Sequence, residues 1–369
     1  MTIKKSHLFY WISSLIFIFY IFFYYQVSNI NVLNLDYEAY TEIILNNDLN
    51  LVFFNDGDHF DYLRITKSFF DEGRSIETFF DALSKGVARN DIVISYFFYL
   101  VSPTVDLIIP TVFIINFLIL TTLYYYNYNL ISETIIKRKI QIFALPFFLL
   151  AFFVPHINKE IFTLLFLYTC INYLNEPSFK KLLYVVILCT FRLQFFFIIV
   201  PLIFFTFIKR LKIIYFLSFI YFAISAYFLQ RFNIISYERL YFSNIFNTSS
   251  FAEINFFLFF NFLKQYFMMF DLNFHYKEFL FSKRIEKFIF FIIACHIVFT
   301  IISNFKQLLV KSSYLNFKIK RFIFVIIIFI MICSITPISS QRYLFMLYPI
   351  FLLCFYYFKI VSSKKLSHY

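Results

Sequence analysis

The sequence predicts an all-α polytopic integral membrane protein, a chain that crosses a lipid bilayer about ten times. Three observations predict this fold class. The 369 residues are 61% hydrophobic and 25% aromatic, with a mean hydropathy of +0.76, which is outside the usual range of soluble domains. Apolar runs recur along nearly the whole chain. The alternation of apolar and polar residues that an outer-membrane barrel needs is not found in them.

The net charge of +12 is placed as the positive-inside rule expects, since basic residues cluster in short loops between apolar runs. This placement argues against nucleic acid as a partner. Lys4 and Lys5 precede the first run, so the amino terminus is expected in the cytoplasm, and the alternation of loops returns the carboxyl terminus to the same side. The predicted cytoplasmic loops hold more than half of the Lys and Arg residues, and their acidic residues are Glu133 and Glu176.

The apolar runs give the order of the predicted elements. A first span at Leu8–Val27 precedes an acidic extracytoplasmic loop, residues 28–91, in which Asp58–Phe70 has the spacing of an amphipathic helix on the membrane surface. Ile92–Ser102 is too short to span and ends at Pro103, which predicts a half-helix on the outer side. Further crossings are expected at Leu107–Leu130, Gln141–Val154, Ile161–Tyr173, Ile213–Leu229, Phe288–Ser303, Phe322–Ile335 and Leu344–Tyr357.

The run Leu182–Ile208 is longer than one span and has basic residues beyond both ends. A single span would leave one basic cluster outside, so we expect two short helices that meet near Arg192. A second extracytoplasmic segment, residues 230–287, contains an interfacial or re-entrant stretch at Ile254–Phe270. The whole chain, residues 1–369, is expected to form a single transmembrane domain.

Charged residues with chemical potential gather at four places on the predicted outer side. In the first, Asp56, Asp58 and Asp61 stand within six residues and precede Arg64. Such carboxylates supply a general base, here Asp58 or Asp61, while Arg64 is expected to bind substrate. A divalent cation at Asp56 and Asp58 is the weaker alternative. The other interpretation is a solvated acidic loop with a turn at Asp56 and Gly57.

The second place is a polar insert between two apolar runs, with His156, Asn158, Lys159 and Glu160. A base beside an acid at a helix start can bind phosphate and transfer protons, which predicts Glu160 as a catalytic group and His156 and Lys159 as substrate ligands. Alternatively, Lys159 and Glu160 cap the neighbouring helices, with the Lys side chain extended towards water.

The third place is Arg192 with Gln194, the most isolated charge of the chain. A guanidinium is a preferred ligand for phosphate oxygens, and it stays charged when buried. The alternative is a structural pair with a buried carboxylate, Asp106 or Glu160.

The fourth place is Arg342 with Tyr343 at the end of a predicted span. Both are expected to bind substrate, and an interfacial anchor is the alternative. His296 is expected to be a helix–helix packing residue.

A lipid-linked substrate follows from these placements. The sequence has no glycine-rich phosphate loop and no hydrolase or metalloprotease motif. Nucleotide sugars are absent outside the cytoplasm, so a substrate there must arrive already activated on a lipid. Arg and Lys side chains would neutralise a pyrophosphate leaving group, and a carboxylate would deprotonate the acceptor hydroxyl. No cofactor is required.

The order of these features resembles that of the Wzy-type O-antigen and exopolysaccharide repeat-unit polymerases, and more broadly the type-C multi-spanning glycosyltransferases. The shared features are the acidic outer loop, the short amphipathic stretch before a long helix, the polar insert at His156–Glu160, the broken helix pair at Arg192 and the late Arg342 and Tyr343. One subgroup has an Arg-Gln pair in the insert and a His in the broken pair, where this chain has Lys159, Glu160 and Arg192.

The resemblance implies an enzyme of the bacterial cytoplasmic (inner) membrane that transfers a growing glycan from undecaprenyl pyrophosphate to the next lipid-linked repeat unit. Membrane lipids and a chain-length regulator protein are the implied partners. Two alternatives stay open. One is a type-C transferase that adds a single sugar from a polyprenyl-phosphate donor, and the other is a flippase for lipid-linked glycan.

Overall fold

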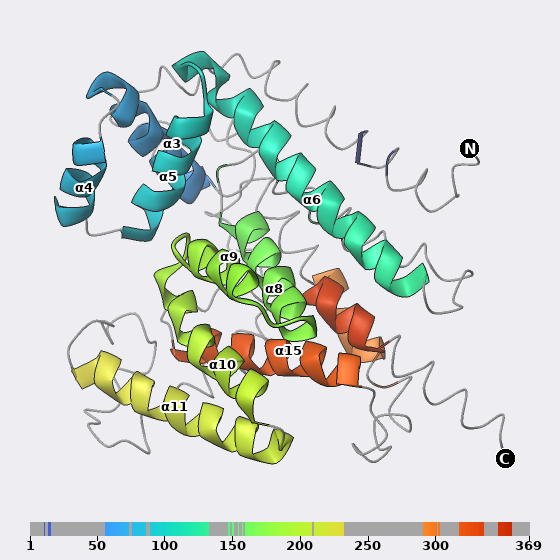
Figure 1. Cartoon of the computed structure of the whole chain (residues 1–369). Helices are drawn as coiled ribbons and strands as arrows, with labels where there is room; N and C mark the ends of the chain where they lie inside the picture. The colour runs from blue at the N-terminus through green and yellow to red at the C-terminus, as the bar shows by residue number, and fades with distance from the viewer. Residues whose placement is uncertain are drawn as a thin grey trace, which may run out of the picture. The chain divides into compact units, whose positions relative to one another are not determined.

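The computed structural model describes residues 11, 14–15, 56–73, 76–85, 89–132, 147, 150, 154, 157, 159–208, 210–231, 291–300, 302, 317–335 and 346–355. Most of these residues are helical, and no strand occurs among them, which confirms the predicted all-α class (Figure 1). The chain divides into two compact units: residues 1–165 with 273–289, and residues 166–272 with 290–369. The single transmembrane domain stays a prediction.

In the part of unit 1 that the structure describes, the helices are α3 (Asp56–Asp71), α4 (Ile76–Lys85), α5 (Arg89–Val101), the short 3₁₀ segment η3 (Val105–Leu107) and α6 (Ile108–Ser132), followed by the start of α8 (Glu160–Asn175). The helix predicted at Asp58–Phe70 is confirmed as α3, and the short helix predicted before Pro103 is confirmed as α5. After α3 ends, Gly73 adopts a φ of +89°, a conformation that favours glycine. The helix α4 was not predicted.

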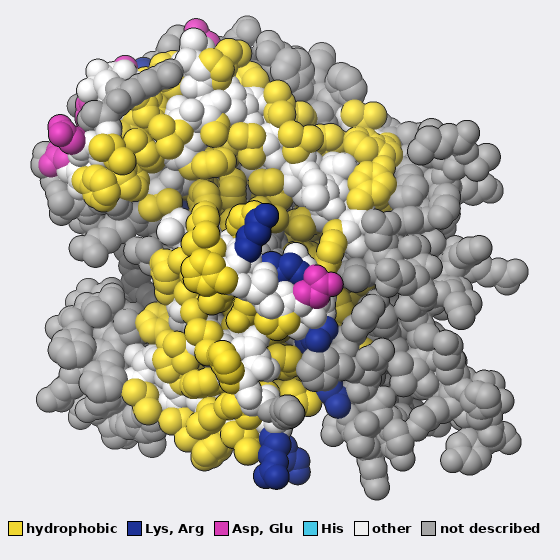
Figure 2. Space-filling view, viewed as in Figure 1, with side chains coloured by type: hydrophobic (Ala, Val, Ile, Leu, Met, Phe, Trp, Pro, Cys, Tyr) yellow, Lys and Arg dark blue, Asp and Glu magenta, His cyan; other side chains and the backbone are white. Residues whose placement is uncertain are grey.

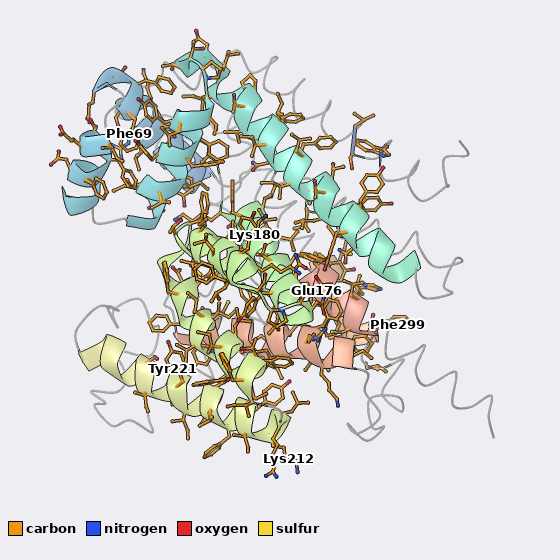
Figure 3. The ribbon with its side chains drawn as sticks, in the orientation of Figure 1. Phe69, Glu176, Lys180, Lys212, Tyr221 and Phe299 are labelled. Carbon is orange, nitrogen blue, oxygen red and sulfur yellow. The ribbon has the colours of Figure 1, made fainter. Side chains whose placement is uncertain are left out.

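A small aromatic core holds α3, α4 and α5 together. Phe69 of α3, labelled in Figure 3, is buried with Ile92 and Tyr99 of α5. Its ring lies 5.1 Å from that of Tyr96, and the Tyr96 ring lies 4.3 Å from that of Phe79 in α4. These contacts between segments far apart in the sequence explain why helices form inside a segment of acidic composition.

The helix α6 carries the longest apolar stretch of the described residues. Val105–Asn127 is the one stretch among them that is long and apolar enough to cross a membrane, with a hydropathy of 2.2. It confirms a helix at the predicted span Leu107–Leu130, whereas the ten crossings stay a prediction. Trp11, within the predicted first span, donates a hydrogen bond of 2.9 Å to the hydroxyl of Tyr125 on α6.

Unit 2 begins within α8 (Glu160–Asn175), after its first six residues. It continues with α9 (Phe179–Cys189), the 3₁₀ helix η5 (Leu193–Ile198), α10 (Ile199–Phe207), α11 (Leu211–Arg231) and α15 (Phe317–Ile335). Helices are thereby confirmed at the predicted runs Ile161–Tyr173, Ile213–Leu229 and Phe322–Ile335.

The break predicted near Arg192 is also confirmed. The amides of Thr190, Phe191 and Arg192 donate to carbonyls three residues back, which tightens the end of α9 into a 3₁₀ turn. Arg192 then adopts an extended conformation, with φ −146° and ψ 99°, before η5 begins.

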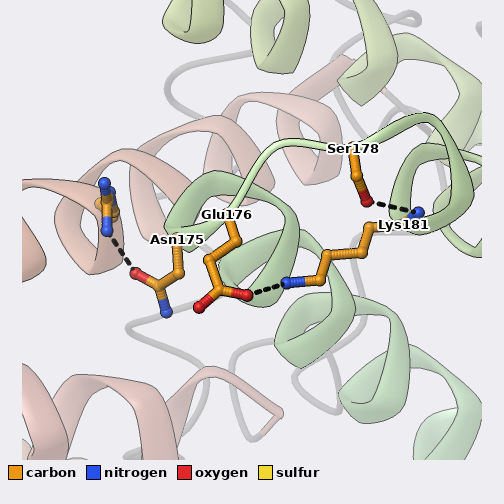
Figure 4. A network of polar contacts seen from close by, with 5 residues as sticks. Asn175, Glu176, Ser178 and Lys181 are labelled. Atoms are coloured by element: carbon orange, nitrogen blue, oxygen red, sulfur yellow. Dashed lines mark hydrogen bonds and ion pairs between the residues drawn. The ribbon is translucent and has the colours of Figure 1, made fainter.

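Polar contacts join the ends of three helices in unit 2 (Figure 4). Arg321, near the start of α15, donates to the side chain of Asn175 at 2.7 Å. Glu176 pairs with Lys181 at 2.7 Å, and Ser178 caps α9 by accepting from the Lys181 amide. The hydrogen bond and the charge of Lys181 lower the pKa of Glu176. These ends were all assigned to the cytoplasmic side, and that side stays a prediction.

Candidate functional site

Buried charge is confined to three side chains among the described residues: Lys159, Glu160 and Arg192 are 9%, 5% and 4% exposed. All three were candidate site residues from the sequence. Burying a charge is costly unless the surroundings compensate it. The surroundings of Lys159 and Arg192 therefore indicate what each position is built for.

Lys159 and Glu160 occupy the start of α8, where Glu160 is the first helical residue. A carboxylate at this end is favoured by the helix dipole. Thr163 fixes the first turn, because both its amide and its hydroxyl donate to the Lys159 carbonyl, at 2.8 and 2.7 Å.

The Lys159 ammonium forms an ion pair with the carboxylate of Asp91, at the start of α5. It also lies 4.9 Å from the centre of the Tyr62 ring on α3, a cation–π contact. The side chains of Lys159 and Asp91 are 10% and 25% exposed. Lys159 is thus buried between two helices rather than extended towards water. We call Tyr62, Asp91, Lys159 and Glu160 the unit 1 cluster.

Hydrogen bonds lock α3 and α5 together beside this cluster. The Ser95 hydroxyl of α5 donates to the Tyr62 carbonyl of α3 at 3.1 Å, and the Thr66 hydroxyl of α3 donates to the Ser95 carbonyl at 3.3 Å. Ser95 follows Asp91 by four residues, so both lie on one face of α5. The two side chains that contact the ammonium are therefore held at fixed places relative to each other.

Aromatic and amide contacts fix the other side of the α8 start. The Phe162 ring meets those of Phe97 and Phe98 edge-on, at 5.5 and 6.1 Å between centroids. The Asn116 side chain on α6 donates to the Val154 carbonyl at 3.0 Å, ahead of the helix. The cluster is bordered by apolar rings, which lower the local dielectric and strengthen the ion pair.

The cluster contains two carboxylates and one ammonium, and that ammonium is already paired. With the ammonium paired to Asp91, a carboxylate of this cluster is the group suited to accepting a proton from a sugar hydroxyl. The sequence prediction of a catalytic Glu160 is compatible with this arrangement, whereas a phosphate-binding role for Lys159 gains no support from it.

The acidic group predicted before Arg64 lies in α3. Asp56 and Gly57 form the start of this helix, and Asp58 and Asp61 stand in its first turns. Their side chains lie outside the described residues, so the base and cation roles stay predictions. Arg64 is exposed on α3. Among the residues searched, no group of three His, Cys, Asp or Glu side chains is placed to hold a metal ion.

Arg192 lies in unit 2, three residues after α9 ends. Its guanidinium carbon is 6.0 Å from the centre of the Phe195 ring, which itself stacks on Phe166 at 4.5 Å. The carboxyl end of α9 favours a cation, so the helix break itself supplies part of the compensation. Gln194 is half-buried in η5. The pairing with Asp106 or Glu160 stays a prediction, since both belong to unit 1.

His296 has the packing role that was expected. Its Nδ1 and the Tyr348 hydroxyl share a hydrogen bond of 2.5 Å, between the apolar helices Phe291–Thr300 and Met346–Phe355. His156, Arg342 and Tyr343 lie outside the described residues, and their roles stay predictions.

Asp91 was missed by the sequence analysis, which used it only to end the acidic loop, and Tyr62 was noted only as part of a helical pattern. The signal for Asp91 was an acid at the start of an apolar helix, a position that ordinarily indicates no more than a favourable dipole contact. Its partner is 68 residues away, and no local pattern reports such a contact.

Comparison with protein-family models, curated proteins and solved structures gives no match for this chain. The resemblance to repeat-unit polymerases therefore rests on the order of elements and charges along the sequence.

Proposed function

We propose that the protein is a glycosyltransferase that polymerises undecaprenyl-pyrophosphate-linked oligosaccharide repeat units at the outer face of the bacterial cytoplasmic membrane. The observation that carries this proposal is the unit 1 cluster, a set of buried and partly buried charges within an apolar, helical chain. Ionisable residues in such surroundings are expensive, and they mark reaction sites and pathways more often than structure.

The surface of α11 supports the proposed membrane location. Phe216 and Phe219 are 63% and 60% exposed on one face of the helix, while Ile214 and Phe222 are buried on another. A helix that is apolar on its exposed face as well as its buried face is suited to lipid. Figure 2 shows hydrophobic side chains over this helix, and Lys212 lies at its amino-terminal end (Figure 3). A basic residue at a helix end is typical of the headgroup region.

The proposed reaction joins two lipid-linked glycans. A carboxylate of the cluster, Glu160 in the first instance, accepts the proton of the acceptor hydroxyl. The hydroxyl oxygen forms a bond to the anomeric carbon of the donor glycan as the bond from that carbon to the pyrophosphate oxygen breaks. Undecaprenyl pyrophosphate leaves with the electron pair of the broken bond. Arg192 and Arg342 stay the ligands that guanidinium chemistry predicts from the sequence for the pyrophosphate.

The lipid-linked and surface glycans of a deletion strain test the proposal. Complete single repeat units without a ladder of longer chains are expected from loss of a polymerase. An incomplete repeat would indicate a single-sugar transferase, and complete units on the cytoplasmic side would indicate a flippase. An unchanged glycan profile would exclude all three functions.

Complementation of the same strain tests the residues. Glu160→Gln and Arg192→Ala should abolish the ladder at normal protein level, whereas Glu176→Gln, at an exposed carboxylate that pairs with Lys181, should leave it intact. Loss of the Arg192→Ala protein itself would favour the structural interpretation of that residue. If Asp58→Asn and Asp61→Asn retain the ladder, the base is not in the first turns of α3.

A further inference from the structure

We propose that Asp91 and Tyr62 are positioning residues, which hold the Lys159 ammonium so that the first turn of α8, and with it Glu160, keeps one place against α3 and α5. Lys159 is on this account an anchor and not a ligand of the pyrophosphate. The inference rests on the proposed function for its kinetic test.

The geometry points to a preformed receptor for the ammonium. Asp91 and Tyr62 come from different helices, and two hydrogen bonds join these helices: the Ser95 hydroxyl donates to the Tyr62 carbonyl, and the Thr66 hydroxyl donates to the Ser95 carbonyl. The ammonium enters between a carboxylate and a ring that are already fixed. A lysine side chain has several rotatable bonds, and two directional contacts of this kind restrict them.

The anchor acts on the helix start through short links. Lys159 immediately precedes Glu160, and its carbonyl receives both hydrogen bonds from Thr163. Phe162 of the same turn meets two rings of α5. The ion pair and the aromatic contact thus tie both ends of one helical turn to α5. A general base must be held close to its productive position, and these contacts restrict the turn that carries the Glu160 carboxylate.

Charge argues against the alternative role of Lys159. The ammonium is paired with Asp91, and a second carboxylate, Glu160, is the next residue. A pyrophosphate that bound the Lys159 ammonium would have to displace Asp91 from a pair that is mostly shielded from water.

The test uses the full chain in vesicles of phosphatidylethanolamine and phosphatidylglycerol, with lipid-linked repeat units isolated from the deletion strain as substrate. The variants are Asp91→Asn, Lys159→Met, the charge exchange D91K/K159D, Tyr62→Phe and Tyr62→Leu. The Glu176–Lys181 pair, in which the carboxylate is 83% exposed, supplies the matched control, E176Q/K181Q. Protein level, kcat and KM are measured for each variant.

If the pair is an anchor, Asp91→Asn and Lys159→Met should lower kcat roughly 10- to 100-fold with an unchanged KM, the size of effect expected from a misplaced catalytic group. The charge exchange should recover most of this loss, since it restores the pair. Tyr62→Phe, which keeps the ring, should retain a kcat close to that of wild type, and Tyr62→Leu should not. The control pair should have no effect.

Two results would overturn the inference. One is a raised KM with little change in kcat for Lys159→Met, together with a charge exchange that recovers protein level but not activity, because Lys159 would then be a ligand. The other is a wild-type kcat and KM both in Tyr62→Leu and in those of the variants Asp91→Asn and Lys159→Met that reach a normal protein level. Tyr62→Leu leaves the ion pair in place, so it decides the question if the single charge variants fail to fold.

A failure of the proposed function can be told apart from these results. If the wild-type protein makes no polymer under the same conditions, the polymerase assignment fails. The positioning role is then tested by the hydrogen-exchange rate of the Thr163 amide. Asp91→Asn should raise this rate, and the double variant D91K/K159D should return it to the wild-type value. Equal exchange in all variants would refute the anchor as well.

Discussion

Replacing Phe69 with Ala should open the α3–α5 assembly while leaving the rest of the chain folded. Phe69 is 1% exposed and contacts Tyr96 and Tyr99 of α5, with ring centroids 5.1 and 5.7 Å away. Phe80 of α4 provides a matched control, since it is the same residue type at 60% exposure. The two substitutions remove the same atoms from a buried and an exposed position.

The magnitude follows from burial. A Phe to Ala change in a packed core costs about 3–5 kcal/mol, which includes the cavity that is left. Two aromatic contacts of about 0.5–1.5 kcal/mol each are part of that loss. At the exposed Phe80 the cost should be about 0.5 kcal/mol or less. Since about 1.4 kcal/mol is a factor of ten in an equilibrium constant, Phe69→Ala should raise the open population of α3–α5 by roughly 10² to 10³ or more.

Hydrogen–deuterium exchange of the full chain in lipid nanodiscs measures this population segment by segment. The amides of α3 and of Ile92–Tyr99 should exchange at least a hundredfold faster in Phe69→Ala and nearly unchanged in Phe80→Ala, while α10 and α11 of unit 2 serve as internal references. Equal effects of the two substitutions would refute the reasoning, because they would show that the Phe69 core does not stabilise these helices.

Three further outcomes are expected. Gly73→Ala should speed exchange in the last turn of α3 about fivefold, since a φ of +89° costs an L-residue about 1 kcal/mol while its Cβ meets open space; a slower exchange would contradict this. Asn116→Leu should lower the midpoint of thermal unfolding. The Asn116 amide donates to the Val154 carbonyl, and leaving that buried carbonyl without this donor costs about 1–3 kcal/mol. Glu176 has a lowered pKa, so its pair stabilises the fold above the ordinary pKa of 4.5 and loses that contribution as the pH falls. Wild type and Glu176→Gln should therefore differ slightly at pH 7 in low salt and coincide at strongly acidic pH, in thermal denaturation curves.

The long apolar helices could be predicted from sequence because their signal is local. Length and apolar content indicate α6, α8, α11 and α15 without any knowledge of their neighbours. The break at Arg192 was accessible for a different reason, since basic residues at both ends of one long apolar run conflict with a single crossing.

The helix α4 was missed because its stability is not local. Its ten residues pack the partly buried Phe79 against Tyr96 and leave Ile76 and Phe80 exposed. Half of these residues are apolar, but the segment is short and lies within an acidic stretch. Short helices of this kind depend on tertiary packing more than on propensity. Asp91 was missed for the same reason, because its ion-pair partner, Lys159, is 68 residues away in the sequence.

The energetics of the Asp91–Lys159 ion pair help to explain why charged residues stand at the start of α8. Removing one partner of a fully buried pair costs about 3–5 kcal/mol, and less here because a quarter of the Asp91 side chain is exposed. Replacing both partners with apolar residues, however, is often neutral, because desolvation offsets most of the Coulomb attraction.

Attachment of α8 to α5 alone would therefore need no charge, and the contact of Phe162 with Phe97 and Phe98 already supplies attachment. The ion pair adds a geometric restraint. An aromatic contact permits the start of α8 to slide along α5, whereas a carboxylate–ammonium pair over a fixed ring resists such sliding. Such a restraint is useful where a neighbouring side chain must be held in one orientation. Glu160, the next residue of the chain, is that neighbour. The position of the Asp91–Lys159 pair next to Glu160, and not the strength of the pair, therefore supports a functional role for this site.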